Sequence, residues 1–320
     1  MKVSRPKFYA FFYALFAAVL SGYLLPLYKY GDQEHYRDFY NYCFYDGYTF
    51  AQQYFCYNNT LSSQEPIYFI LSKIAHFFVE NKDYFIILSN SIFAYVLVLL
   101  ILKYYQKVFH RHIFLALIFA NYYFIVLLFS AERLKFSFIF LALALLISQK
   151  KRVVMMIVAM AAHTQILLLA APYFISKIFV GSKGVSAKIA AIVVPSAAFS
   201  LILYFLQDHI VSKLDSYSGI AEDAGVGIIG ALKTSIFLIL AFVSTRQIIP
   251  VVAGLPLVFA AYQMGSNRVG MLAFVLYVAA VLYYKRRMDF ILFIVMLYFA
   301  SKSYQFIYNI IVYGNGYFTP

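Results

Sequence analysis

Long apolar stretches recur along almost the whole chain, and they constrain its fold more than any other feature of the sequence. The first runs from residue 8 to residue 27, and comparable stretches follow up to residue 311. A stretch of roughly 20 apolar residues is long enough to cross the hydrocarbon core of a bilayer as a helix. Repeated stretches of this length predict an all-α, polytopic integral membrane protein.

The composition supports this prediction and excludes other common classes. Of the 320 residues, 64% are hydrophobic and only 12% are charged, whereas soluble domains carry roughly 25% charged residues. A disordered chain needs low hydrophobicity and high charge, and this chain has neither. The formal net charge of +13 is interpreted as an orientation signal in a membrane protein. We therefore expect no nucleic-acid partner.

Nine segments are predicted to cross the membrane, and two shorter apolar pieces would raise the number of helices at the membrane to eleven. The first segment follows a basic stretch, as in a signal peptide, but its length favours a retained first helix. The two shorter pieces are 67–79 and 153–179. The nine predicted spans are 8–27, 84–102, 113–129, 134–148, 187–206, 226–243, 248–264, 269–284 and 290–311.

The two shorter pieces are placed as an outer-face helix (67–79) and a re-entrant hairpin (153–179), because the charges then sort between the two sides. With the N-terminus inside, 16 of the 26 Lys and Arg residues face the cytoplasm together with a single acid, Asp289. The positive-inside rule predicts this asymmetry. If 67–79 crossed instead, the basic segment 103–111 would face outward, and we disfavour that arrangement.

One membrane domain over residues 1–320 is expected, with a main extracytoplasmic loop at 28–66 and a second one at 207–225. The main loop holds nine tyrosines and four phenylalanines between Tyr28 and Tyr57. Tyrosine suits the membrane interface, so the loop is interpreted either as an interfacial belt or as a platform for a sugar. Cys43 and Cys56 lie in the same loop, and one disulfide is expected if the loop is outside.

Polar residues that interrupt the apolar stretches are the candidates for chemistry. Glu65 precedes Pro66, so it is either a charge at a helix N-terminus or an acid that accepts a proton from an attacking hydroxyl. Arg133 lies between two predicted spans within Glu132-Arg133-Leu134-Lys135. It either caps a turn or grips phosphate oxygens through its guanidinium.

Two further polar residues also have either a structural or a functional interpretation. His163 interrupts an Ala-, Met- and Leu-rich stretch and is either a hydrogen-bonded packing residue or part of a polar cavity, where irregular backbone is tolerated. Arg268 lies at an outward-facing turn and either snorkels to the headgroups or contacts substrate. The sequence carries no Walker A loop, HExxH, paired CxxC or Asp-x-Asp motif. We expect no metal and no bound cofactor.

Several short motifs occur in a fixed order along residues 8–180. They are Gly31-Asp32 with Tyr36, Glu65-Pro66-Ile67-Tyr68, Arg133 at the start of a span, and Ala162-His163-Thr164. In this order the chain resembles the EpsG-type group of Wzy-like polysaccharide polymerases, which carry G-x-D-Y-x-x-Y, E-x-x-Y/F, I-R-Q and A-x-x-F-H motifs. The chain departs from that group in having Gln33, Leu134 and Ala162 in place of tyrosine, glutamine and phenylalanine.

The resemblance implies a glycan polymerase that joins oligosaccharide units carried on undecaprenyl pyrophosphate at the outer face of a bacterial inner membrane. O-antigen, capsule and exopolysaccharide synthesis are the processes it implies. The expected partners are the lipid-linked glycan donor and acceptor, the lipid bilayer and a chain-length regulator. The implied catalytic positions are Asp32, Glu65, Arg133 and His163. The expected substrate-binding residues are Tyr36, Arg37, Lys135 and Arg268.

In this hypothesis Arg133 and Arg268 hold the donor pyrophosphate, and Asp32 or Glu65 takes the proton from the acceptor hydroxyl. Two other classes stay open: a flippase or transporter of lipid-linked sugars, and another lipid-donor transferase such as a glycosyltransferase or a ligase. A transporter predicts polar residues throughout the bilayer depth and a two-fold repeat. Here the polar residues favour one face.

Overall fold

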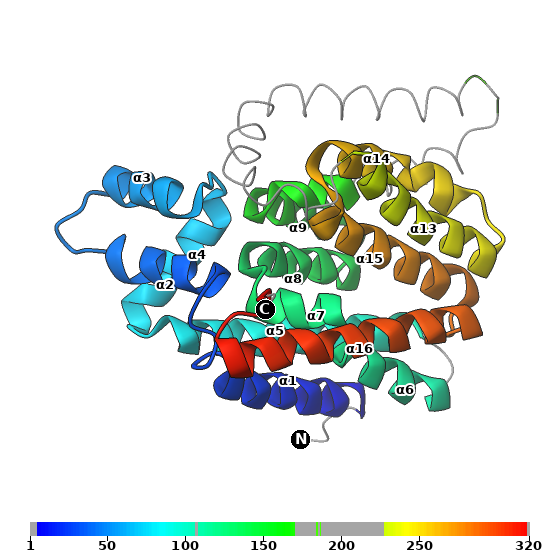
Figure 1. Cartoon of the computed structure of the whole chain (residues 1–320), viewed down its shortest axis with the longest axis horizontal. Coiled ribbons are helices and arrows are strands. Elements are labelled where there is room, and N and C mark those ends of the chain that lie inside the picture. The colour runs from blue at the N-terminus through cyan, green and yellow to red at the C-terminus, as the bar shows by residue number, and fades with distance from the viewer. Residues whose placement is uncertain (1–4, 106–107, 170–183, 185, 187–226, 319–320) are drawn as a thin grey trace. The chain divides into compact units, whose positions relative to one another are not determined.

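The computed structural model describes residues 5–105, 108–169, 184, 186 and 227–318, and every regular element in them is helical (Figure 1). Among these residues, five helices are long and apolar enough to cross a membrane, and a bent pair gives a sixth candidate. The predicted all-α, polytopic membrane fold is therefore confirmed. The predicted span 187–206, the second outer loop 207–225 and part of the predicted hairpin, 170–179, lie outside the described residues.

The five long helices coincide with predicted spans to within a few residues. The predicted spans 134–148 and 248–264 form shorter helices, α8 (Glu132–Leu146) and α14 (Ile249–Met264), of 15 and 16 residues. At 1.5 Å per residue these are about 22–24 Å long, shorter than a hydrocarbon core of about 30 Å. The long helices are α1 (Arg5–Leu24), α5 (Lys82–Tyr104), α13 (Ile228–Thr245), α15 (Ser266–Lys285) and α16 (Phe290–Tyr313).

The predicted span 113–129 is broken in the structure. It consists of α6 (Val108–Phe119) and α7 (Tyr122–Phe129), which are bent by 48° at the break. Asn121 explains the break, because its side-chain oxygen accepts a hydrogen bond from the Tyr123 amide at 2.9 Å and so caps α7. The Ala120 carbonyl, freed at the same place, accepts a hydrogen bond from Ser303 Oγ at 2.6 Å.

The chain divides into two compact units. The first comprises Met1–Thr164 with Phe293–Pro320, and the second Gln165–Leu292. In the first unit α5 packs along both α1 and α8, and α9 (Gln149–Ala162) packs along α8 (Figure 1). In the second unit α13, α14 and α15 pack on one another, and a side chain at Gly254 would collide with Leu238.

Helix α1 shows why these helices suit a lipid environment. One face packs against α5 through small residues spaced three or four apart, which lets the two backbones approach closely. The opposite face carries large exposed side chains, including Phe11 at 63% and Val19 at 67%. Such a face is stable only where the surroundings are apolar. The small buried residues are Ala10, Ala14, Ala17 and Ser21.

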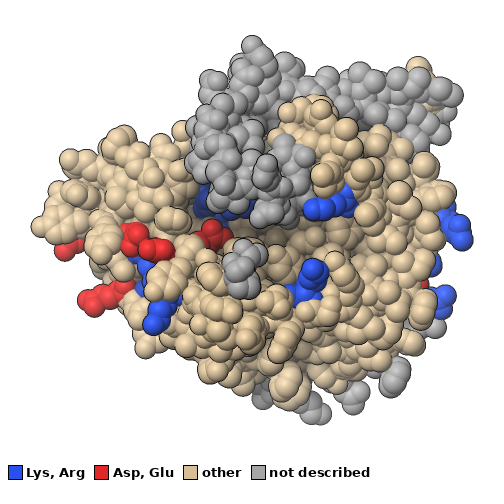
Figure 2. Space-filling model, viewed as in Figure 1, with Lys and Arg blue, Asp and Glu red and all other residues tan. Residues whose placement is uncertain are grey.

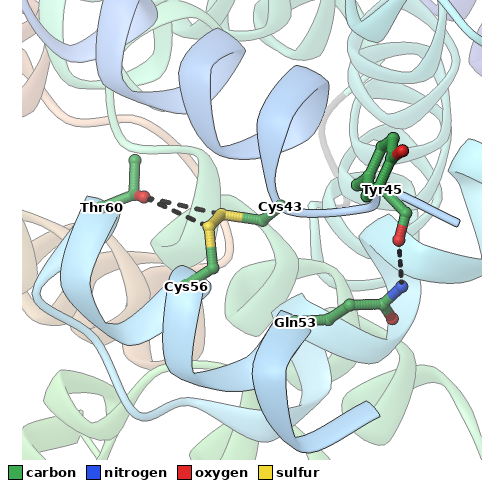
Figure 3. Close-up of a disulfide and its surroundings, with 5 residues drawn as sticks. All are labelled: Cys43, Tyr45, Gln53, Cys56 and Thr60. Carbon is green, nitrogen blue, oxygen red and sulfur yellow. Dashed lines mark hydrogen bonds between the residues drawn. A yellow bond between two sulfur atoms is a disulfide. The ribbon is translucent and has the colours of Figure 1, made fainter. Parts of the chain in front are cut away.

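Segment 28–66, predicted to be the main outer loop, is mostly helical. It forms α2 (Asp32–Tyr42) and α3 (Phe50–Leu61), and the predicted outer-face helix follows as α4 (Pro66–Phe78). A disulfide joins Cys43 to Cys56 with their Cα atoms 5.4 Å apart (Figure 3), within the usual range for such bonds. The predicted pairing is present, and it links α2 to α3.

The aromatic residues of this segment divide into two groups by burial. One group is buried and forms the interior of the α2–α3–α4 cap, with Phe39 and Tyr57 ring centroids 4.9 Å apart. The other group is exposed, including Tyr42 at 70% and Tyr45 at 66%. The buried rings hold the cap together, and the exposed rings are available to lipid or to a ligand.

Candidate functional site

The site is built on a second helix break, between α7 and α8. Helix α7 ends at Phe129 and α8 begins at Glu132, so the carbonyls around the break lose their helical partners. The Leu128 carbonyl accepts a hydrogen bond from Asn90 Nδ2 at 3.1 Å, and the Phe129 carbonyl accepts one from Gln33 Nε2. Broken backbone at membrane depth is tolerated when protein groups satisfy it in this way.

Three of the four predicted catalytic residues meet beside this break. The Arg133 guanidinium donates to Glu65 Oε2 at 2.9 Å, and His163 Nδ1 lies 2.8 Å from Glu65 Oε1. Their exposed fractions are only 4% for Glu65, 7% for Arg133 and 3% for His163. We call these residues the Glu65 cluster; both carboxylate oxygens of Glu65 are engaged in it.

Local structure explains why Glu65 lies here. It is the N-cap of α4, before Pro66 in the first helical turn, yet its side chain makes no capping hydrogen bond. Glu65 therefore combines its place at a helix N-terminus with contacts to Arg133 and His163. Its backbone is held by Tyr57, whose hydroxyl donates to the Glu65 carbonyl at 3.1 Å and lies 2.8 Å from Ser63 Oγ.

Tyr57 stays a proton donor in this position. Burial, followed by the negative charge of Glu65, raises the pKa of the Tyr57 phenol. A raised phenol pKa keeps the hydroxyl protonated throughout the physiological range, so the bond to Glu65 does not depend on pH there.

His163 reaches the cluster because α9 ends directly before it. Helix α9 finishes at Ala162, and His163 is extended, with φ −161° and ψ 121°. A 3-10 turn, Thr164–Ile166, follows. The predicted break in segment 153–179 is thus confirmed at His163. Ser137 of α8 donates to the Ala159 carbonyl at 2.7 Å and fixes this end of α9.

A second buried network adjoins the first through consecutive residues of α8. Glu132 Oε1 accepts from Lys82 Nζ at 2.6 Å and from Gln33 Nε2 at 2.8 Å, while Oε2 accepts from the Tyr68 hydroxyl at 2.8 Å. Lys82 also donates to Gln33 Oε1 at 2.7 Å. We call Glu132, Lys82, Gln33 and Tyr68 the Glu132 cluster. Glu132 is 0% exposed and Lys82 is 2% exposed.

Two predicted substrate ligands lie next to these clusters. Tyr36 is buried, its ring centroid lies 5.9 Å from that of Tyr68, and its hydroxyl hydrogen-bonds to Arg133. Lys135 is fully buried and donates to Asn90 Oδ1 at 2.5 Å, and Asn90 donates in turn to Ser21 Oγ. Tyr36 thus joins the two clusters, whereas Lys135 ties α8 to α5 and α1. Substrate binding by either stays a prediction.

The other predicted site residues lie elsewhere. Asp32 accepts a hydrogen bond from Ser130 at the α7–α8 break and makes none to the Glu65 cluster. Arg37 donates to Asp83 at 3.2 Å and to the Tyr28 and Leu25 carbonyls at 2.6 and 2.7 Å. Arg268 lies in the first turn of α15 in the second unit, so its sharing a site with Arg133 stays a prediction.

Five buried ionisable side chains lie in or next to the two clusters. They are Arg133, Lys82, Lys135, Glu65 and Glu132, and all are less than 10% exposed. Buried charges in a membrane protein are costly and mark ligand or ion sites. Within the described residues, no three His, Cys, Asp or Glu side chains form a set of metal ligands.

No family model, curated protein or solved structure matches this chain.

Sequence analysis missed four members of these networks: Gln33, Lys82, Tyr68 and Asn90. Asn90 gave a usable signal, because it lies in the middle of a 23-residue apolar helix, where a polar side chain needs a partner. Lys82 gave none, since a lysine at the end of a span normally snorkels to the interface. Only the fold shows that it points inward to Glu132.

Proposed function

We propose that this membrane protein is a glycan polymerase that transfers lipid-linked oligosaccharide units from a polyprenyl pyrophosphate donor to an acceptor glycan. The observation that carries the proposal is the Glu65 cluster, in which a buried arginine, histidine and glutamate from three distant segments meet beside a helix break. The sequence resemblance to EpsG-type polymerases, based on the same three residues, supports it.

Arg133 is the proposed ligand of the donor pyrophosphate. A guanidinium has five N–H donors and grips phosphate oxygens in pairs, and Glu65 and Tyr36 hold only part of it. As the bond from the anomeric carbon to the pyrophosphate oxygen breaks, negative charge grows on that oxygen. A fixed cation in a site of low dielectric constant stabilises this charge with little reorganisation.

His163 and Glu65 are proposed to handle the proton. The acceptor hydroxyl oxygen attacks the anomeric carbon, and its proton passes to the imidazole of His163 as the lipid pyrophosphate leaves. Glu65 Oε1, 2.8 Å from Nδ1, orients the ring and stabilises the imidazolium, as a carboxylate does behind a catalytic histidine. Asp32, engaged with Ser130, is a less suitable base than the sequence suggested.

The Cys43–Cys56 disulfide supports an extracytoplasmic location for the cap. Structural disulfides persist in oxidising compartments and are rare in the cytosol, and this bridge joins the two helices beside the site. Together with the asymmetric charges of the sequence, it favours a bacterial inner-membrane protein with its active face outside. O-antigen, capsule and exopolysaccharide assembly are the processes that match this placement.

A transporter or flippase of lipid-linked sugars is the second candidate. The observation in its favour is the Glu132 cluster, because a saturated Lys–Glu pair inside a helical bundle also occurs in ion-coupled transporters.

One experiment separates the two candidates. Variants are expressed in a strain that lacks the chromosomal copy and any other polymerase, and surface glycans are separated by size. A polymerase without Arg133 displays single repeat units, whereas loss of a flippase removes the surface glycan. We expect single units from Arg133→Ala and full-length polymer from Arg287→Ala, an exposed arginine that serves as the matched control. Full-length polymer from Arg133→Ala would refute the proposed function.

A further inference from the structure

A polar pocket lies in the first unit, beside α2 and the turn between α4 and α5. Its volume is about 410 Å³, and its lining residues are Arg37, Asn41, Glu80, Asn81, Lys82 and Asp83. Figure 2 shows acidic and basic side chains close together at the left of the view, where Figure 1 places these helices. A volume of roughly 300–1,000 Å³ is typical of small-ligand sites.

The walls of the pocket are held in place without any ligand. Arg37 is fixed by Asp83 and by the carbonyls of Tyr28 and Leu25. Asn81 Oδ1 accepts the Asp83 amide at 2.8 Å, and Lys82 is fixed from behind by the Glu132 cluster. Four of the six lining side chains, Arg37, Asn81, Lys82 and Asp83, are therefore held before a ligand enters.

The lining groups that make no hydrogen bond within the protein indicate which class of ligand the pocket suits. Asn41 and Glu80 are exposed and make no side-chain hydrogen bond to the described residues, and Asn81 Nδ2 is likewise unused. These groups supply both donors and acceptors. Arg37 is paired with Asp83 and Lys82 with Glu132, so the charge left over in the lining is that of Glu80. Such a lining suits a hydroxyl-rich ligand better than a phosphate, which the Glu80 carboxylate would repel.

We propose that this pocket is a glycan subsite that holds a neutral sugar ring of the lipid-linked repeat unit. The proposal rests on the proposed function and adds to it a place where the sugar is recognised. A short series of contacts connects the pocket to the Glu65 cluster. Lys82, which lines the pocket, donates a hydrogen bond to Glu132, and Glu132 is followed directly by Arg133 in the first turn of α8. A sugar held here is therefore anchored to the helical turn that carries the proposed pyrophosphate ligand.

The test measures sugar binding to the full-length protein in lipid nanodiscs. The probe is the oligosaccharide that mild acid releases from the lipid-linked glycan of the host strain, titrated by calorimetry. We expect Asn41→Ala and Glu80→Gln each to raise the Kd about fivefold, the effect of losing one or two hydrogen bonds. Asn59→Ala, an exposed asparagine on α3, is the matched control and should bind as the wild type does.

A parallel titration with inorganic pyrophosphate distinguishes the two sites. Asn41→Ala should leave pyrophosphate binding unchanged, and Arg133→Ala should abolish it. In the polymerisation assay, Asn41→Ala should raise the KM for the lipid-linked substrate while kcat stays close to wild type. An oligosaccharide that does not bind the wild type, or an unchanged Kd in both pocket variants, overturns the glycan subsite.

The two proposals can fail separately. If Asn41→Ala and Glu80→Gln are normal but Arg133→Ala stops polymerisation, the subsite is wrong and the polymerase stands. If Arg133→Ala makes full-length polymer, the proposed function is wrong, and the Kd values alone then decide whether the pocket binds a sugar.

Discussion

Two consecutive residues of α8 begin two different buried networks. In the Glu132 cluster, both carboxylate oxygens are satisfied by Lys82, Gln33 and Tyr68 at 2.6–2.8 Å. In the Glu65 cluster, the partners of the carboxylate are Arg133 and His163, a cation with further donors and a ring that titrates near neutral pH in model compounds.

We therefore expect the Glu132 cluster to stabilise the fold and the Glu65 cluster to take part in the reaction. A saturated ion pair stabilises one arrangement of helices, whereas an arginine and a histidine that share one carboxylate can exchange contacts with a ligand. Loss of a Glu132 partner should therefore affect folding, and loss of a Glu65 partner should affect turnover.

The largest effect is expected from Glu132→Ala. This change leaves the ammonium of Lys82 buried without its carboxylate, and breaking a buried ion pair costs about 3–5 kcal/mol. We expect a large loss of folded protein, measured as monodisperse protein after detergent extraction and as the thermal unfolding midpoint. The double variant Glu132→Gln with Lys82→Met removes both charges and should recover most of the loss. A Glu132→Ala protein that melts like the wild type would contradict the assignment of a structural role.

Glu65→Gln should have the largest effect on turnover alone. If Glu65 and His163 act together on the acceptor proton, removing the carboxylate charge lowers the rate by about 10²–10⁴-fold. Asp32→Asn is the comparison, because it keeps an acceptor for Ser130 and should stay close to the wild-type rate. Polymer formation from purified lipid-linked units measures both. A normal rate for Glu65→Gln combined with a slow Asp32→Asn would reverse the two roles.

Arg133→Lys should be nearly as damaging as Arg133→Ala. An ammonium cannot reproduce the paired N–H donors of a guanidinium, and loss of one group that stabilises developing charge lowers rates by about 10²–10³-fold. Because Arg133→Ala also leaves the buried Glu65 carboxylate without its cation, the amount of folded protein in the membrane is measured beside the rate, and the rate is expressed per folded molecule. Full activity in the lysine variant would show that only charge is needed at this position.

Removing the disulfide tests whether both clusters need an intact α2–α3–α4 cap. It joins α2, which carries Gln33 of the Glu132 cluster, to α3, which carries Tyr57 beside Glu65. Removing a bridge that closes a loop of about 15 residues costs up to about 3 kcal/mol. The Cys43→Ser, Cys56→Ser protein should unfold at a lower temperature, and its activity should fall less than that of Glu65→Gln. An equal fall in activity would mean that the cap is part of the catalytic apparatus.

Tyr57→Phe should have the smallest effect. It removes one buried hydroxyl that donates to the Glu65 carbonyl, a loss of about 1 kcal/mol in the free energy of unfolding. Turnover should fall only several-fold, because the carboxylate keeps both of its partners. Tyr54→Phe on the same helix is the control, since the Tyr54 hydroxyl donates to the Gln64 carbonyl at the surface.

Sequence analysis predicted the membrane class and most spans, and it singled out Glu65, Arg133 and His163 one by one. Charged or polar residues in or beside apolar stretches are costly, so these three stand out against their surroundings. The same reasoning could not pair them, because the residues of the cluster lie 68 and 98 positions apart. Only the packing of α8 and α9 brings them together.

The outer segment was less predictable. Its mixture of tyrosines and charges shows no clear helical period, and helices as short as α2 and α3 are marginal without tertiary packing. Their stability comes from the buried rings and the disulfide, which are contacts between distant residues. Arg37 illustrates the same limit: its contacts with Asp83 and the carbonyls of Tyr28 and Leu25 exist only once α2 has folded back on α1 and α5.

The disulfide has a practical consequence for following this protein in the bilayer. The chain has two cysteines and no tryptophan, and both cysteines are joined to each other. A single cysteine introduced at any position is therefore the sole free thiol for a spin label or maleimide dye, and a single introduced tryptophan is the sole indole fluorophore. The depth of each helix in the membrane, and any movement of α8 when donor is added, can be recorded one residue at a time against a silent background.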